Sequence, residues 1–238
     1  MKNRLLLIVF LLIVLSVINA CNSKPKTDNR SHYLELYQKA NENKDVFTAI
    51  VALNEYLLKD TAINQYHDSL AIMYFLTGNF ASGVIIGEKV IDKNPNNIKL
   101  AELMSEGYQK TNQYDKSIAI TQKLFNDTKD YRYLYQVATL QFEDQRVKDC
   151  ENTIAQILKE GIDSATTIEM SPGGLADIVP IEAACYNLKA MIEDQVNNDF
   201  ATSLKYFEKA LKVYPQFKFP RAYIKEKQYQ AYMAQGGR

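Results

Sequence analysis

The chain has 238 residues, of which 47% are hydrophobic and 24% are charged. These fractions are ordinary for a folded protein and argue against a disordered chain. Lysine and arginine together number 28, as do aspartate and glutamate, so the formal net charge is zero. The basic residues are interspersed with acidic ones and form no basic stripe, so we expect no nucleic-acid binding.

The segment 1–20 has the layout of a secretory signal peptide. Two basic residues, Lys2 and Arg4, precede an uncharged run at 5–18, and a cysteine follows at position 21. The run counts 14 residues (18 − 5 + 1), fewer than the roughly 20 that a membrane-spanning helix needs. We therefore expect export, with residues 1–20 removed by cleavage.

The residues up to that cysteine, Ile18-Asn19-Ala20-Cys21, resemble the lipobox of bacterial lipoproteins, although Asn19 departs from its commonest pattern. The resemblance implies lipidation of the Cys21 thiol, and several acyl chains would anchor the protein stably to a membrane of the bacterial cell envelope. Asn22 is not acidic, which favours the outer membrane, facing the periplasm. The alternative is a plain secretory signal in which Cys21 is incidental.

A polar segment without apolar pattern follows, so residues 21–29 are expected to form a lipidated cysteine and its tether. At about 3.3 to 3.6 Å per residue, this tether could hold the folded part some 25 to 30 Å from the membrane surface.

From position 30 onward, the same pattern returns at a constant distance. Tyr33, His67, Ala101 and Tyr135 follow one another at equal intervals (67 − 33 = 101 − 67 = 135 − 101 = 34). Further anchors repeat in step, at a spacing that places them on one face of a helix. We therefore favour a repeat of helix pairs over an unrelated helical bundle.

This pattern resembles the tetratricopeptide repeat, whose unit has the same length and combines small residues at the helix contact with aromatic residues that fill the gaps. The clearest copy runs over 64–97, where Gly78 suits a turn and Pro95 stops a helix. The resemblance implies an all-α fold, a right-handed superhelical array of about five helix-turn-helix units with a C-terminal capping helix. The repeat domain is expected at 30–235, with units near 30–63, 64–97, 98–131, 132–163 and 182–215 and the capping helix at 219–235.

The later units depart from the pattern. The fourth is expected to lack one turn residue, because Val147, Cys150 and Ile154 fit the second helix one position early. In the fifth, Lys189 stands where a small residue is expected, and its turn is predicted to span about two residues.

An insertion at 164–181 separates these two units. Two short runs, 166–170 and 175–179, flank Ser171-Pro172-Gly173-Gly174, whose composition is typical of a turn, so we predict a β-hairpin. Because an isolated hairpin is barely stable, it should pack on its neighbours. It could belong to a binding face or be a surface excursion without a role.

No catalytic or cofactor-binding motif is found. His32 and His67 are the only histidines, and His67 occupies a core position of the repeat, so we expect no metal site and no cofactor. We therefore expect a protein that is not an enzyme. Cys150 and Cys185 could form a disulfide after export, but buried free thiols at small packing positions are favoured.

The repeat resemblance implies binding of a protein or peptide on a concave face lined by the first helix of each unit. The lysine and asparagine clamp of chaperone-binding relatives is absent, since Leu34, Gln38 and Asp68 stand in the matching places. The expected face carries the acidic residues Asp68, Glu102 and Glu106 beside the apolar residues Ile72 and Phe75. This composition favours a partner with basic and apolar residues. The expected partner-binding residues are Leu34, Gln38, Asp68, Ile72, Phe75, Glu102, Glu106, Gln109, Gln136 and Leu140.

The favoured function is thus a lipid-anchored envelope scaffold or adaptor. A lipoprotein that captures glycans or nutrients at the cell surface is the alternative, disfavoured because the chain has no tryptophan and only one short insertion. An enzyme with an unrecognised site ranks last.

Overall fold

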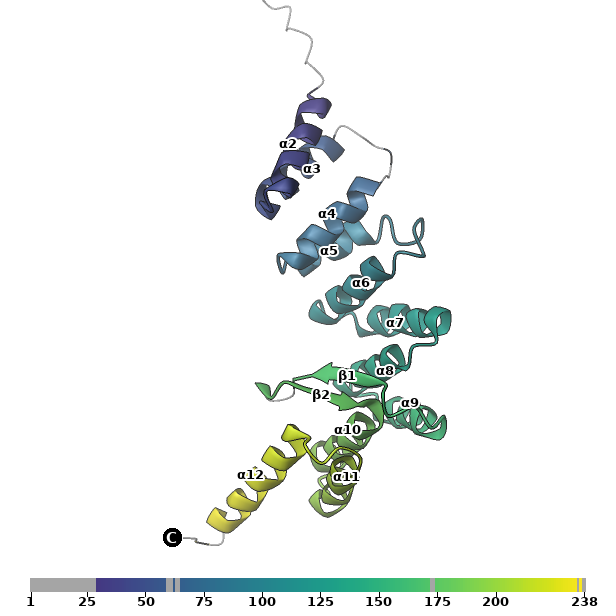
Figure 1. Ribbon diagram of the computed structural model, residues 1–238, viewed down its shortest axis with the longest axis vertical. Helices are drawn as coiled ribbons and strands as arrows, with labels where there is room; N and C mark the ends of the chain where they lie inside the picture. The colour runs from purple at the N-terminus through teal and green to yellow at the C-terminus, as the bar shows by residue number, and fades with distance from the viewer. Residues whose placement is uncertain (1–28, 59–61, 63–64, 172–173, 235, 237–238) are drawn as a thin grey trace, which may run out of the picture. The chain divides into compact units, whose positions relative to one another are not determined.

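The computed structural model describes residues 29–58, 62, 65–171, 174–234 and 236. These residues hold eleven α-helices and one two-stranded sheet (Figure 1). The predicted signal peptide, Cys21 and nearly all of the tether lie outside them. The chain divides into two compact units, the first ending at Tyr66 and the second beginning at His67.

The first unit contains a helix pair, α2 (Arg30–Glu42) and α3 (Val46–Leu57). Asp45 caps α3, because its carboxylate accepts a hydrogen bond from the Thr48 amide at 3.1 Å. Small side chains allow the two helices to approach closely, and their buried residues are Ala40, Ala49, Ala52 and Leu53.

The remaining helices continue the pairing, and the predicted all-α fold of helix-turn-helix units is confirmed. Within the pairs, α6 packs on α7, α8 on α9, and α10 on α11. The helices are α4 (Gln65–Leu76), α5 (Phe80–Gly87), α6 (Ile98–Lys110), α7 (Tyr114–Thr128), α8 (Tyr131–Glu143), α9 (Val147–Lys159), α10 (Ile181–Gln195), α11 (Phe200–Val213) and α12 (Lys218–Ala234).

The turn between the two helices of each pair contains one residue in the left-handed backbone conformation. These residues are Lys44, Gly78, Asn112, Gln145 and Asn198, with φ between 55° and 75°. In the first four pairs the turn has three residues and closes by a backbone hydrogen bond of 2.8 or 2.9 Å to a carbonyl five residues earlier.

Two predicted turn lengths were wrong. The fourth turn keeps three residues, 144–146. Its closing bond, from the Arg146 amide to the Gln141 carbonyl, follows the bond from Gln113 to Tyr108 after 33 residues, one fewer than the repeat length. The shorter period therefore arises before the turn. The fifth turn has four residues, 196–199, instead of about two.

The predicted hairpin is confirmed as β1 (Thr167–Met170) and β2 (Asp177–Pro180), which pair antiparallel with Glu169 opposite Ile178. Ile168 and Val179 share one face of the hairpin and are buried in the same hydrophobic cluster as residues of α8, α9 and α10. The hairpin is therefore fixed by packing on the helices that flank it in sequence.

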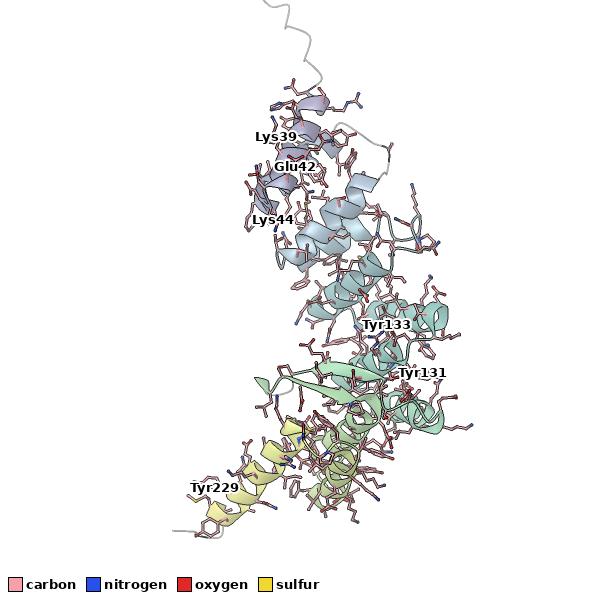
Figure 2. All side chains as sticks on the ribbon, in the orientation of Figure 1. Lys39, Glu42, Lys44, Tyr131, Tyr133 and Tyr229 are labelled. Atoms are coloured by element: carbon pink, nitrogen blue, oxygen red, sulfur yellow. The ribbon has the colours of Figure 1, made fainter. Side chains whose placement is uncertain are left out.

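The C-terminal helix α12 covers the last helix pair, as predicted for a capping helix. Phe207 of α11 is fully buried, and the rings of Phe219 and Tyr223 lie 6.4 and 5.3 Å from it. Asp194 of α10 accepts hydrogen bonds from Tyr223 and Lys227 of α12. Beyond these contacts α12 extends away from the last helix pair, and Tyr229 near its end is exposed (Figure 2).

In the second unit, one aromatic ring fixes the spacing of α4, α5 and α6. Phe75 of α4 is 4% exposed and lies against two glycines, Gly83 of α5 and Gly107 of α6. A Cβ atom would lie 2.6 Å from this ring at Gly83 and 2.4 Å from it at Gly107. Because the ring is enclosed on both sides, it cannot move away from an added side chain.

We therefore expect Gly107→Val to lower the free energy of unfolding by about 1–3 kcal/mol, since the added carbons overpack this contact. Urea unfolding followed by circular dichroism measures the change. The double variant Phe75→Leu/Gly107→Val should lose less stability than the sum of its single variants. An unchanged urea midpoint for Gly107→Val would show that the ring is not held between the glycines.

Candidate binding surface

Polar side chains link the first helices of neighbouring pairs. Tyr133 of α8 donates a hydrogen bond to Glu102 of α6 at 2.7 Å. Gln109 of α6 donates to Glu143 of α8 at 2.6 Å. The exposed Glu106 lies between these two bonds along α6. We call the surface carried by Glu102, Glu106, Gln109, Gln136 and Glu143 the first-helix face.

Tyr133 holds one carboxylate of this face in place. Burial, followed by its hydrogen bond to Glu102, raises the pKa of Tyr133 to about 12. The phenol therefore remains a hydrogen-bond donor over the whole physiological pH range. Figure 2 shows Tyr133 near the beginning of α8, and the bond to Glu102 ties this position to α6.

A buried hydroxyl cluster underlies the same face. The Ser105 hydroxyl of α6 lies 3.1 Å from that of Ser117 and 2.6 Å from that of Thr121, both on α7. The Gln136 amide of α8 donates to Ser105 at 3.3 Å. These small residues allow close helix contact and satisfy one another's hydrogen bonds, so the cluster connects three helices.

Asp68 serves a structural role in the second unit. Its carboxylate accepts hydrogen bonds from the side-chain amides of Asn94 at 2.6 Å and Asn97 at 3.2 Å. Asn97 in turn caps α6 by accepting from the Leu100 amide at 3.0 Å. The acid predicted to face a partner thus fixes the connection between α5 and α6.

Two of the predicted partner-binding residues are corrected. Phe75 and Leu140 are 4% and 1% exposed, so they form core contacts and cannot reach a partner. Helical spacing alone predicted that both side chains face a partner. The ring of Phe75 instead packs against the two glycines, Gly83 and Gly107. Of the remaining predicted residues, Gln38 and Glu106 are exposed, and Leu34, Asp68, Ile72, Glu102, Gln109 and Gln136 are half-buried.

A cavity of about 500 Å³ borders the first-helix face between α8 and the hairpin. The hairpin contributes consecutive residues of β1 and its end, 167–171. Sequence reasoning predicted the hairpin but missed this cavity, because the alternating pattern does not show on which helix the strand lies. The helix contributes Arg132, Tyr135, Gln136, Thr139 and Glu143.

A second cavity, of about 610 Å³, lies between α7 and the segment after α5. It lies where α5 ends after only eight residues, against 15 in α7, and where turns replace helix over most of 88–97. Ile91, Ile98 and Ile120 give it an apolar lining. The lysines at this cavity already have acidic partners, Glu88 for Lys116 and Asp127 for Lys123, each at 2.7 Å.

Two features are absent from the described residues. Within them, no group of three or more His, Cys, Asp or Glu side chains is arranged to hold a metal ion. None of the helices there combines the length and apolar character needed to cross a membrane.

Neither a family model nor a curated protein matches the chain. Solved structures do. A tetratricopeptide repeat protein from Parabacteroides merdae ATCC 43184 is 15% identical, with a TM-score of 0.57 over 88% of this chain and 74% of its own. MamA from Desulfovibrio magneticus RS-1 is 14% identical, with a TM-score of 0.54 over 78% of this chain and 95% of its own.

A further MamA structure, MSR-1, is 18% identical, with a TM-score of 0.53 over 78% of this chain and 96% of its own. Together with the observed helix pairs, these similarities show that the chain has the tetratricopeptide-repeat fold. At such low identity they show the fold alone.

The two described cysteines are buried free thiols. Cys150 and Cys185 lie in the hydrophobic cluster formed by α8, α9, α10 and the hairpin. Burial raises the pKa of Cys150 to about 12 and also raises that of Cys185. At neutral pH both therefore remain protonated and shielded from solvent, which is typical of packing residues.

In a Cys21→Ser background, we expect Cys150 and Cys185 to react with iodoacetamide at pH 8 more than about 100-fold more slowly in the folded chain than in urea. Mass spectrometry counts the alkylated thiols over time. Rapid alkylation of Cys185 without unfolding would contradict the packing described here.

Proposed function

We propose that this chain is a scaffold that binds a protein or peptide partner through the first-helix face and the cavity beside it. The observation that carries the proposal is their adjacency, because Gln136 and Glu143 belong to both. A concave cavity bordered by a few fixed polar groups is typical of a binding site. The tetratricopeptide-repeat fold supports this use, since its stacked units offer extended binding surfaces.

The charges at this site favour a basic partner. Glu102, Glu106 and Glu143 lie on the first-helix face, and Glu169 lies on the cavity's strand side. Two cations lie nearby, and each has an acidic partner: Arg132 is ion-paired with Asp130, and the Lys99 ammonium lies 3.9 Å from the Glu102 carboxylate. Carboxylates thus predominate, so a partner segment with lysine or arginine side chains would complement them.

We further propose that lipid on Cys21 anchors the scaffold in the bacterial cell envelope, at the outer membrane facing the periplasm. The support comes from the sequence at 18–21 and from the short apolar run before it. A stable anchor would restrict the binding surface to one membrane, where partners of the same compartment would collect.

The charge proposal predicts a loss of partner binding in the triple variant Glu102→Gln/Glu106→Gln/Glu143→Gln. With a photo-crosslinking amino acid at Thr139, inside the cavity, capture of the cellular partner should fall at least about fivefold, since three attractive charges are removed. Glutamine retains the side-chain oxygen, so the hydrogen bonds to Tyr133 and Gln109 can persist. Quantitative mass spectrometry of the crosslinked products measures the change.

The matched control removes three exposed acids from second helices, as Asp115→Asn/Asp127→Asn/Glu208→Gln. It changes the net charge equally and should leave capture unchanged. Equal losses in the two triple variants would indicate a general charge effect and would exclude the first-helix face as the binding site.

The anchor proposal predicts that Cys21→Ser shifts the protein from the membrane fraction to the soluble fraction, because the thiol is the lipid attachment point. Partition between aqueous and Triton X-114 phases provides the measurement. Asn22→Ser is the control and should remain in the detergent phase. A Cys21→Ser protein that still enters the detergent phase would contradict lipidation at this residue.

A further inference from the structure

The pairing of the hairpin determines which backbone groups lie on its outer edge. Ile181 donates a backbone hydrogen bond to Thr166 at 3.0 Å, just beyond the pair formed by Thr167 and Pro180. Bonded and non-bonded pairs alternate in an antiparallel ladder, so Ile168 exchanges bonds with Val179. The amide and carbonyl groups of Thr167 and Glu169 then point away from β2.

The cavity beside α8 lies along this outer edge. Side chains of successive strand residues point to opposite faces of a sheet. Every residue of β1 nevertheless lines the cavity. The cavity therefore lies beside the strand and not over one face of the hairpin. A smaller cavity of about 330 Å³, lined by Asp130, Arg132 and 165–167, continues the opening toward the start of β1.

The opposite edge of the hairpin is held by the start of α12. The Lys218 backbone amide donates to the Asp177 carboxylate at 3.0 Å, and its ammonium group donates to the Ala176 carbonyl at 2.7 Å. Ile168 and Val179 fix the inner face. The hairpin is thus held on one face and, through Asp177 and Ala176, at the start of β2. A cavity of about 410 Å³ lies beside Asp177, Ile178 and Lys218, whereas along β1 the open space lies between the strand and α8.

We propose that β1 is a docking edge on which an extended segment of the partner adds a third β-strand, lying between the hairpin and α8. Thr167 and Glu169 would contribute two amide donors and two carbonyl acceptors to the new ladder. This inference rests on the proposed scaffold function and names the conformation of the bound segment.

The surroundings of the edge determine the side chains that such a segment would carry. Its alternate residues would face the α8 side chains or the exposed carboxylate of Glu169. Glu143 and Glu169 are acidic, whereas the Arg132 guanidinium is bound to Asp130. The partner is therefore an extended segment with a basic side chain, and its main chain supplies most of the hydrogen bonds.

The test uses peptides selected from a displayed library of random dodecapeptides against the purified full chain. Fluorescence anisotropy then compares their Kd values for Glu169→Pro and Ile178→Pro. These residues face each other in the register, and both amides point out of the ladder, but on opposite edges. Proline removes an outward donor without removing a bond between β1 and β2. At Ile178 this donor is bound to the Asp177 carboxylate at 3.1 Å, so the control variant also removes that bond.

We expect Glu169→Pro to raise the Kd at least tenfold and Ile178→Pro to change it less than twofold. Glu169→Gln, which keeps the amide and removes the charge, should have a smaller effect than Glu169→Pro. As a test independent of the variants, bound peptide should slow hydrogen exchange of the Thr167 and Glu169 amides in the unmodified chain at least tenfold.

The possible failures are distinguishable. In one outcome, the selected peptides bind Glu169→Pro normally, leave both amides unprotected and lose affinity for the triple glutamine variant of the first-helix face. This outcome would overturn the docking edge and leave the scaffold proposal standing. Failure to select any peptide, or peptides indifferent to all these variants, would overturn both.

Discussion

Close contact between helices at small residues is the constraint on which the second unit depends. Gly83 and Gly107 leave room for only one ring, that of Phe75, and Ser105 meets Ser117 and Thr121 at hydrogen-bond distance. When helices lie this close together, a larger side chain between them would not fit. Because this side of each first helix is used for packing, its other side is left for polar residues, which is how a repeat core produces a binding surface.

The polar residues on that other side also bind one another. Glu102 and Gln109 connect α6 to α8, so these side chains are ordered before any partner arrives. An ordered surface loses less side-chain entropy on binding than a mobile one, which favours affinity. The same bonds limit the residues available to a partner, since each group must keep or exchange its present hydrogen bond. Glu106, exposed among them, is the carboxylate best placed for a new contact.

The recurring pattern of the sequence was sufficient to predict the helix pairs, although its period shortens by one residue before the fourth turn, because packing requires small and aromatic residues at fixed positions of every unit. It could not predict which first-helix residues remain accessible. Phe75 is buried because two glycines from other helices receive its ring, and Glu102 meets Tyr133, 31 residues away, through side-chain conformations that no periodicity specifies. The hairpin was predictable from alternation and turn residues, whereas its position beside α8 depends on the burial of Ile168 and Val179.

The exposed edge of β1 needs a physical reason to persist, because an unpaired strand edge invites aggregation. Its length of four residues and the charge of Glu169 limit indiscriminate pairing. Neither feature prevents pairing with a segment whose charge is opposite. A short edge that disfavours acidic segments and attracts a basic one would combine protection with selectivity. Packing of the hairpin on α10 and its hydrogen bonds to Lys218 keep this edge in position, so a partner would meet a strand that is already formed.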